Sequence, residues 1–290
     1  MLTPLIRWFD GYQQAHRWLA FPCAVLRKFS DDGAGNLAAL IAYYSFFSLF
    51  PLLLVFVSVL GIVLRGHPGL EDRILNSALS QFPVLGEQLK LHSLSGSGLA
   101  LSVGIVGALW AGLAVTRAAQ YAMNEVWGVP PERRPNFLVS RLRGLVLLAI
   151  LGTMTLATTF VSGLSTLPGL PGAARLLWYP ASLALNVALF AVAFRVLTRQ
   201  RLSTGEILPG AVLGAVLWTA MQLVGTYFVT HRIQEATSIY GTFALVIGVL
   251  VWFYVGAQIT LYAAEINVVR ARRLWPRSLI ATPLTSARDE

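Results

Sequence analysis

The sequence predicts an all-α, polytopic transmembrane bundle of about six helices, and three observations lead to this fold class. Hydrophobic residues make up 56% of the 290 positions and charged residues only 12%, against the roughly 25% charged residues of an ordinary soluble domain. Six apolar runs are each long enough to cross a hydrocarbon layer of about 30 Å at about 1.5 Å per helical residue. No alternating strand pattern of about ten residues occurs, so backbone groups in lipid must be satisfied within helices.

The N-terminal segment is expected to form an interfacial amphipathic helix. Across residues 1–30, apolar side chains such as Leu5, Phe9 and Leu26 recur at helical spacing, and polar side chains occupy the other faces. Pro22 lacks a backbone donor, so we expect this helix to break near Pro22.

The six expected spans follow at about 37–64, 98–120, 142–166, 176–197, 207–229 and 241–267, with a basic cytoplasmic tail at 268–290. Between the first two spans, residues 70–91 place an apolar stripe on one face and predict an extracytoplasmic amphipathic helix. This helix either caps the outer mouth of the bundle or lies on the membrane surface. Because we find no internal repeat and no low-complexity tract, residues 1–290 are expected to form a single membrane domain.

The placement of the basic residues predicts the orientation. Seventeen of the 22 Lys and Arg residues lie in the N-terminal segment, the 117–143 and 195–201 connections and the C-terminal tail, all on one side of the spans. By the positive-inside rule this side is cytoplasmic, and both termini lie there. Topology thereby accounts for the net charge of +9, so we expect no nucleic-acid partner.

The first span contains a proline and several polar residues. Pro51 cannot donate a backbone hydrogen bond, so a kink is expected there, and the kink leaves a carbonyl group without its helical partner. One interpretation is that this carbonyl, together with Tyr43, Ser45 and Ser48, lines a cavity or substrate path. The other is a long tilted helix whose serines bond to their own backbone.

Small residues at four-residue spacing indicate helix contacts. Gly210 and Gly214 form a GxxxG pair in the fifth span, and Gly107 and Ala111 form a similar pair in the second. Such spacing lets two helix backbones approach closely. These positions argue for packing and carry no chemistry.

Polar residues form a stripe on each of two spans. In the last span Tyr254, Gln258 and Glu265 fall within about 40° of one another at about 100° per residue, with Asn267 just beyond. In the second span the stripe consists of Arg117, Gln120 and Asn124. Because a charge within a span is costly unless it is paired or hydrated, we hypothesise an ion pair between Arg117 and Glu265. The alternative is that Arg117 extends to the membrane interface and Glu265 is solvated there.

The remaining polar residues do not predict catalysis. Ser203 and Glu206 have capping-box spacing at the start of the fifth span. The four histidines are scattered, Cys23 is the single cysteine, and we find no nucleotide-binding or hydrolase motif. We therefore expect no cofactor, no metal site and no enzymatic activity.

Together these segments resemble the YihY/BrkB family of bacterial inner-membrane proteins. The resemblance covers about residues 25 to 270. It rests on the run from Ala38 to Pro51, on Met123 to Gly128, on Pro209 to Trp218, and on the aromatic and acidic positions of the last span. The motif positions are Tyr43, Tyr44, Pro51, Asn124, Gly210, Tyr240, Gly241, Trp252, Tyr254, Glu265 and Asn267. Ala263 departs from the pattern, which favours glycine there.

The resemblance implies a six-helix fold in the bacterial cytoplasmic membrane and supplies no reaction. Members carry labels that include virulence factor and ribonuclease, and some are linked with lipid export. The ribonuclease label finds no support here, since no acidic metal cluster or histidine pair is present to cleave a phosphodiester.

Two functions remain open from the sequence, and a third is less favoured. The first is a transporter or translocase of a lipid, lipophilic or anionic solute, with Arg117, Asn124, Gln258 and Glu265 near its cytoplasmic entrance. The second is a non-catalytic structural or assembly protein of the cell envelope, whose polar stripes join helices or bind a protein partner. The third is an intramembrane enzyme that acts on lipid. Membrane lipids are the expected surroundings in each case, and the oligomeric state stays open.

Overall fold

The computed structural model describes residues 3–63, 98–134, 136–164, 172–200 and 202–278. In these ranges all regular secondary structure is helical, and six segments are long and apolar enough to cross a membrane. The predicted all-α transmembrane class is therefore confirmed. The expected helix at 70–91 and the last twelve residues of the tail lie outside the described ranges.

The helices of the bundle follow the expected spans closely. They are α3 (Ala34–Val63), α5 (Gly98–Val126), α6 (Phe137–Leu164), α7 (Gly172–Leu197) and α8 (Thr204–Ala271), and a short 3-10 helix, η1 (Pro131–Arg133), precedes α6. α5 continues six residues beyond the expected end at 120 because Ala122, Met123 and Val126 are buried in the core.

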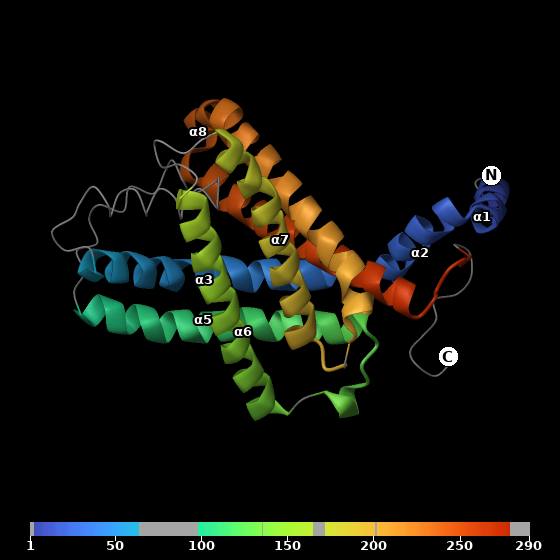
Figure 1. Ribbon diagram of the computed structural model, residues 1–290, viewed down its shortest axis with the longest axis horizontal. Coiled ribbons are helices and arrows are strands. Elements are labelled where there is room, and N and C mark those ends of the chain that lie inside the picture. The colour runs from blue at the N-terminus through green and yellow to red at the C-terminus, as the bar shows by residue number, and fades with distance from the viewer. Residues whose placement is uncertain (1–2, 64–97, 135, 165–171, 201, 279–290) are drawn as a thin grey trace.

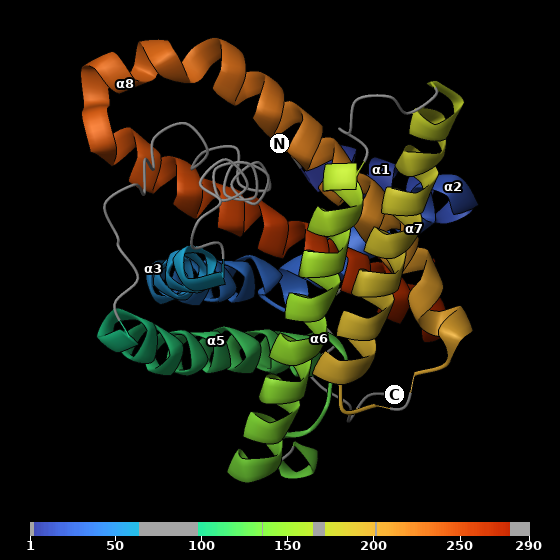
Figure 2. The same ribbon diagram turned by 60° about the vertical axis from the view of Figure 1, so that its left-hand side comes forward.

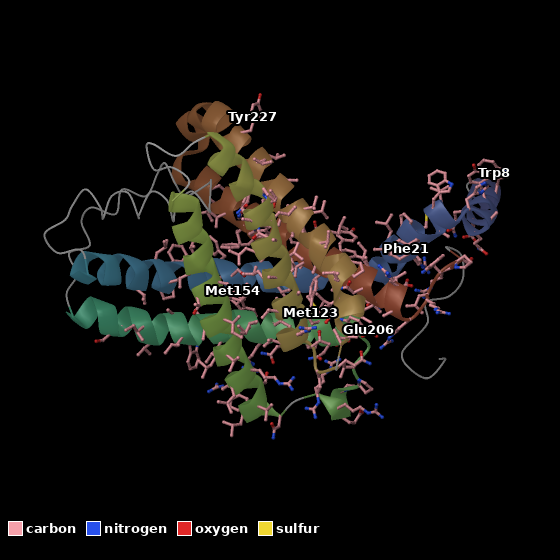
Figure 3. The ribbon with its side chains drawn as sticks, viewed as in Figure 1. Trp8, Phe21, Met123, Met154, Glu206 and Tyr227 are labelled. Atoms are coloured by element: carbon pink, nitrogen blue, oxygen red, sulfur yellow. The ribbon has the colours of Figure 1, made fainter. Side chains whose placement is uncertain are left out.

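The fifth and sixth spans belong to one helix. α8 has 68 residues, and Figures 1 and 2 show that it bends back on itself so that its two arms run side by side. Gly225 lies against the ring of Trp252, and Gly256 lies against the ring of Trp218. Figure 3 places Glu206 and Tyr227 at opposite ends of the first arm. The first arm starts with the predicted capping box, in which the Ser203 N–H donates to the Glu206 carboxylate (2.6 Å).

The N-terminal segment forms two helices, α1 (Thr3–Ala15) and α2 (Arg17–Asp31). The expected break near Pro22 is wrong, because Pro22 lies inside α2 and the chain breaks at His16. The backbone of His16 is extended, and its ring Nδ1 lies 2.9 Å from the Tyr12 carbonyl oxygen and so closes the end of α1. α2 packs on α3 and α8, so it docks on the bundle.

Pro51 lies within a continuous helix. α3 runs from Ala34 to Val63, and the hydroxyl of Ser48 donates to the carbonyl oxygen of Ser45 (2.8 Å). The Pro51 ring packs against Gly107 of α5, where an added Cβ would lie 3.1 Å from the proline Cβ. A glycine at 107 therefore lets α3 and α5 pack closely along their length, as Figure 1 shows.

The main core lies at one end of the bundle, where α3 begins, α5 ends, α6 begins, α7 ends, and α8 both begins and ends. We call this the basic end, because it adjoins α2, the α5–α6 and α7–α8 connections and the end of α8, the segments near which the sequence has most of its Lys and Arg residues. Phe194, Met123, Ile207 and Leu261 fill the core from four helix segments. Large apolar side chains on the outer faces of the helices are exposed, among them Trp110, which is 75% exposed, and these faces suit contact with lipid.

Gly210 lies where the two arms of α8 touch. Its N–H donates to the side-chain oxygen of Asn267 (2.7 Å), and an added Cβ would overlap the carbonyl oxygen of Ala263. Gly214 lies beside it, close to Phe190 of α7. Both glycines thus sit at close helix contacts.

We predict that Gly210→Ala lowers stability by roughly 1–3 kcal/mol, because the added methyl group pushes the arms of α8 apart. Gly205→Ala is the matched control, since nothing lies within 4 Å of a Cβ at Gly205 on the same helix. Thermal melting of the two purified variants in detergent measures the difference. Equal melting temperatures for both variants would contradict this packing.

Candidate functional site

Lys28 belongs to a helix that is not one of the six spans, yet its side chain lies inside the bundle. It lies on α2, next to Phe29, whose ring stacks on Tyr262 of α8 with centroids 3.8 Å apart. Ala24 and Val25, one turn earlier, pack against Val269. The apolar face of α2 thus docks on the second arm of α8 and carries Lys28 into the basic end, where it is 8% exposed.

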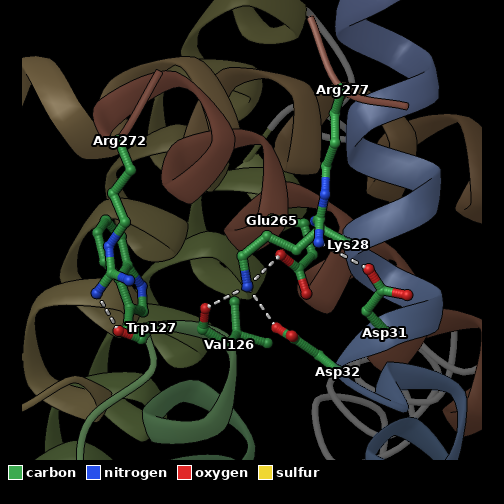
Figure 4. Close-up of polar contacts among 8 residues, drawn as sticks. All are labelled: Lys28, Asp31, Asp32, Val126, Trp127, Glu265, Arg272 and Arg277. Atoms are coloured by element: carbon green, nitrogen blue, oxygen red, sulfur yellow. Dashed lines mark hydrogen bonds and ion pairs between the residues drawn. The ribbon is translucent and has the colours of Figure 1, made fainter. Parts of the chain in front are cut away.

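The ammonium group of Lys28 lies near oxygen atoms from three segments, two of which accept hydrogen bonds from it (Figure 4). It donates to the Asp32 carboxylate (2.5 Å) and to the backbone carbonyl of Val126 at the end of α5 (3.0 Å). Its third neighbour is the carboxylate of Glu265 on α8, at 3.5 Å. Two carboxylates therefore share one lysine.

Glu265 is the least satisfied member of this cluster. Its side chain is fully buried, and neither carboxylate oxygen has a hydrogen bond to the part of the chain that the structure describes. With both carboxylates ionised, the three side chains carry one net negative charge in a site that excludes most water. Burying such a charge costs free energy, which protonation of one carboxylate or binding of a cation would reduce.

The end of α5 holds Lys28 in place. Gly128 adopts the left-handed conformation (φ +60°), and the Val129 N–H bonds back to the carbonyl of Asn124 (2.8 Å), which ends the helix in a Schellman turn. Three cations bind carbonyls at and just beyond this helix end: Lys28 binds Val126, Arg272 binds Trp127, and Arg134 binds Val129 (3.1 Å). They also oppose the negative end of the helix dipole.

A second set of ion pairs surrounds the cluster. Asp31, beside Asp32, pairs with Arg27 on its own helix (3.2 Å) and with Arg277 beyond α8 (3.0 Å). These contacts tie α2 to the chain that follows α8, as Figure 4 shows for Arg277. α2, and with it Lys28, is therefore held both by the second arm of α8 and by the chain that follows α8.

The expected ion pair between Arg117 and Glu265 is wrong. Arg117 is exposed, and its guanidinium lies over the ring of Phe137 with 5.7 Å to the centroid. Glu265 faces Lys28 instead. The alternative, in which Glu265 is solvated, is also wrong, because Glu265 is fully buried.

The other polar residues of the two stripes bind neighbouring helices. Gln120 accepts from the hydroxyl of Ser140 (2.8 Å) and donates to its carbonyl (3.2 Å), which joins α5 to α6. The side-chain oxygen of Asn124 accepts from the Arg199 N–H after α7 (3.4 Å), and Asn267 joins the arms of α8. These amides satisfy backbone groups, and all three are buried.

The structure does not gather all the predicted residues into one site. Tyr254 is half-buried, and a Cβ at Gly35 on α3 would lie 3.8 Å from its hydroxyl oxygen. Gln258 is half-buried on the next turn of α8. Tyr43, further along α3, is 54% exposed and packs against Tyr44 and Phe47.

Sequence reasoning missed Lys28 and Asp32. Lys28 lies in the segment 1–30 that is expected to be an interfacial helix, and Asp32 follows it directly, where a charged pair four residues apart is ordinary. One signal was available: the chain uses lysine at only two positions, Lys28 and Lys90, and arginine at the other basic positions. A lysine carries a compact point charge with three rotatable donors, whereas arginine carries a planar fork of donors.

The comparisons with known proteins agree on one family. Residues 25–283 match the family described as "Virulence factor BrkB". A UPF0761 membrane protein of Pseudomonas paraeruginosa is 31% identical over 291 residues, which cover 95% of this chain and 67% of that protein. Inner membrane protein YhjD of Escherichia coli is 28% identical over 260 residues, which cover 82% of this chain and 77% of YhjD.

One relative carries a name from another functional class. Putative ribonuclease-like protein YfkH of Bacillus subtilis is 23% identical over 252 residues, which cover 81% of this chain and 90% of YfkH. This chain spans about two thirds of the length of the Pseudomonas relatives that it matches. No solved structure matches it. The match over most of its length shows that this multi-pass membrane protein belongs to the Virulence factor BrkB family.

Proposed function

We propose that this protein is an inner-membrane transporter or translocase of a lipid, lipophilic or anionic solute. The observation that carries the proposal is the burial of Glu265. Its carboxylate lies 3.5 Å from the ammonium group of Lys28, which also pairs with Asp32. Ionisable groups within spanning helices are costly, and in membrane proteins they mark ion and substrate pathways. A purely structural contact at this place would be served better by neutral, fully paired groups.

The basic end lies in the cytoplasm in this proposal, with both termini. The support is the positive-inside rule applied to the seventeen basic residues on that side. An arginine-rich protein surface attracts dissolved anions and anionic lipid headgroups. The Lys28 cluster then lies where an anionic solute would enter or leave.

The cluster couples charge to helix position. When Glu265 is ionised, Lys28 balances two carboxylates and holds α2 against α8. When Glu265 takes up a proton, Lys28 is balanced by Asp32 on its own helix, and the electrostatic attraction between α2 and α8 is lost. Uptake of a proton would thereby loosen the docking of α2 and open the cytoplasmic side of the bundle.

The second candidate function is a structural or assembly protein of the cell envelope. It is supported by the buried amides of Gln120, Asn124 and Asn267, each of which is used to join helices. In this case the apolar outer faces of the helices bind an envelope protein, and the Lys28 cluster serves only to dock α2.

We do not propose enzymatic activity. Across the described residues no three His, Cys, Asp or Glu side chains come together in a way that could hold a metal ion. The ribonuclease-like name belongs to the Bacillus subtilis relative, and the Lys28 cluster lacks a nucleophile and a base arranged to cleave a phosphodiester.

We predict that Glu265→Gln abolishes most of the transport driven by a proton gradient, because the amide cannot take up a proton. The measurement is the movement of a fluorescent phospholipid and of a panel of organic anions across proteoliposomes, with orientation and folded fraction checked. Glu206→Gln is the matched control, since it removes the same charge from the same helix at its capping box.

Three results of this assay separate the candidates. A defect confined to Glu265→Gln, in protein that is folded, supports the transporter. Wild-type rates in both variants would mean that Glu265 is no part of a transport pathway. Absence of transport by the wild-type protein for every solute tested would favour the envelope assembly role.

We also predict a strongly non-additive response in a double-mutant cycle of Lys28 and Glu265. Lys28→Met leaves the buried Glu265 carboxylate and the half-buried Asp32 carboxylate without this counter-ion and should cost roughly 3–5 kcal/mol of stability. Adding Glu265→Gln removes one of these charges, so the double variant should be more stable than Lys28→Met alone. Melting of the four proteins in the same detergent measures the coupling. Additive losses would show that the two side chains do not interact.

A further inference from the structure

A pocket opens beside the C-terminal end of α8. Its volume is about 560 Å³, and its lining comes from α1, α2, the last turn of α8 and the chain that follows α8: Gln14, Ala20, Arg270, Arg273, Trp275 and Pro276. Neither Lys28 nor Glu265 lines it. The pocket is therefore separate from the cluster on which the transport proposal rests, and what it binds can be tested whether or not the protein transports.

The walls of this pocket are held by specific contacts. Gln13 donates to the Arg277 carbonyl (2.7 Å), and Ser278 donates to the Asp10 carboxylate (2.7 Å). The ring of Trp275 meets the edge of Phe21 with centroids 6.0 Å apart. The chain after α8 is thus fixed to both N-terminal helices, so the pocket is part of the folded structure.

Two guanidinium groups at the pocket have no acceptor. Arg270 and Arg273 are exposed, and among the residues that the structure describes neither side chain has a hydrogen bond or an ion pair. They are not needed to cap α8, because the carbonyl of Val268 accepts from the Arg272 N–H (2.9 Å) and that of Val269 from the Leu274 N–H (3.0 Å).

Arg273 is in the left-handed region (φ 53°), which costs a residue other than glycine roughly 1–2 kcal/mol. The carboxylate of Asp10, one turn before Gln14, accepts hydrogen bonds from Gln13, Gln14 and Ser278, and Asp10 does not line the pocket. The charge in the pocket is therefore positive.

We propose that this pocket binds a phosphate-bearing anion and that its source is the headgroup of an anionic membrane lipid. Two arginines supply forked donors that match a phosphate, and Gln14 and Trp275 complete a lining with both polar and apolar parts. The neighbouring helices expose Trp8 (67%), Trp18 (69%) and Leu26 (57%), side chains that suit the membrane interface, and Figure 3 shows Trp8 on α1 at the edge of the molecule.

The test uses the full chain in detergent with three probes: short-chain phosphatidylglycerol, short-chain phosphatidylcholine and inorganic phosphate. Binding is measured by the shift in melting temperature and by native mass spectrometry. The test variant is Arg270→Gln with Arg273→Gln, and the control variant is Arg133→Gln with Arg199→Gln, which removes the same charge from exposed positions of the basic end outside the pocket.

Phosphatidylglycerol is expected to stabilise the wild-type protein and the control variant, and the pocket variant should bind it at least about tenfold more weakly. Phosphatidylcholine, which has no net charge, should have little effect. Equal binding of phosphatidylglycerol by the pocket and control variants overturns the proposal. Stabilisation by inorganic phosphate at the same concentrations, again lost only in the pocket variant, supports the anion site and overturns the lipid as its source. Equal melting temperatures of the two variants without probe show that both are folded.

Discussion

Lys28 joins three segments that are far apart in the sequence: α2, which carries it, the C-terminal end of α5 and the second arm of α8. The rest of the basic end depends on this contact. α2 covers the end of α8 only if Lys28 finds acceptors there, because an ammonium group buried without them would cost several kcal/mol. One acceptor exists because α5 ends before Gly128 and leaves the Val126 carbonyl free to accept from Lys28, and Glu265 of α8 supplies a neighbouring negative charge.

The position of the spans was predictable from the sequence, and the site was not. Uninterrupted apolar runs locate helices in a membrane because lipid leaves the backbone no other choice. Arg117 and Glu265 were each placed correctly near the basic end of their own helix, but periodicity fixes only the face that a residue occupies on that helix. Which helices are neighbours depends on packing, and the partner of Glu265 came from α2, a segment with too few apolar residues to be counted as a span.

Other differences have the same origin. The end of α5 lies beyond its apolar run because buried contacts at Met123 and Val126 hold the last turns in the helix. Pro22 does not break α2, whereas His16 ends α1, since a local pairing with the Tyr12 carbonyl decides where the chain leaves the helix. The spacing of Gly210 and Gly214 predicts a close helix contact. Only the structure shows that the backbone nearest to Gly210 is that of Ala263, on the other arm of the same helix. In each case a contact distant in sequence or a single local bond outweighs the intrinsic preference of the segment.

The bend in α8 has a consequence for the order in which the protein assembles during synthesis. Its arms are adjacent in the chain, so they can pair as a helical hairpin as soon as the second arm enters the membrane. α2 leaves the ribosome long before this, yet its docking surface consists of residues near Tyr262, Glu265 and Val269. α2 can therefore dock only after the second arm of α8 has been made. Until α8 is made, Lys28 has no partner on that helix, and burying its charge would be unfavourable.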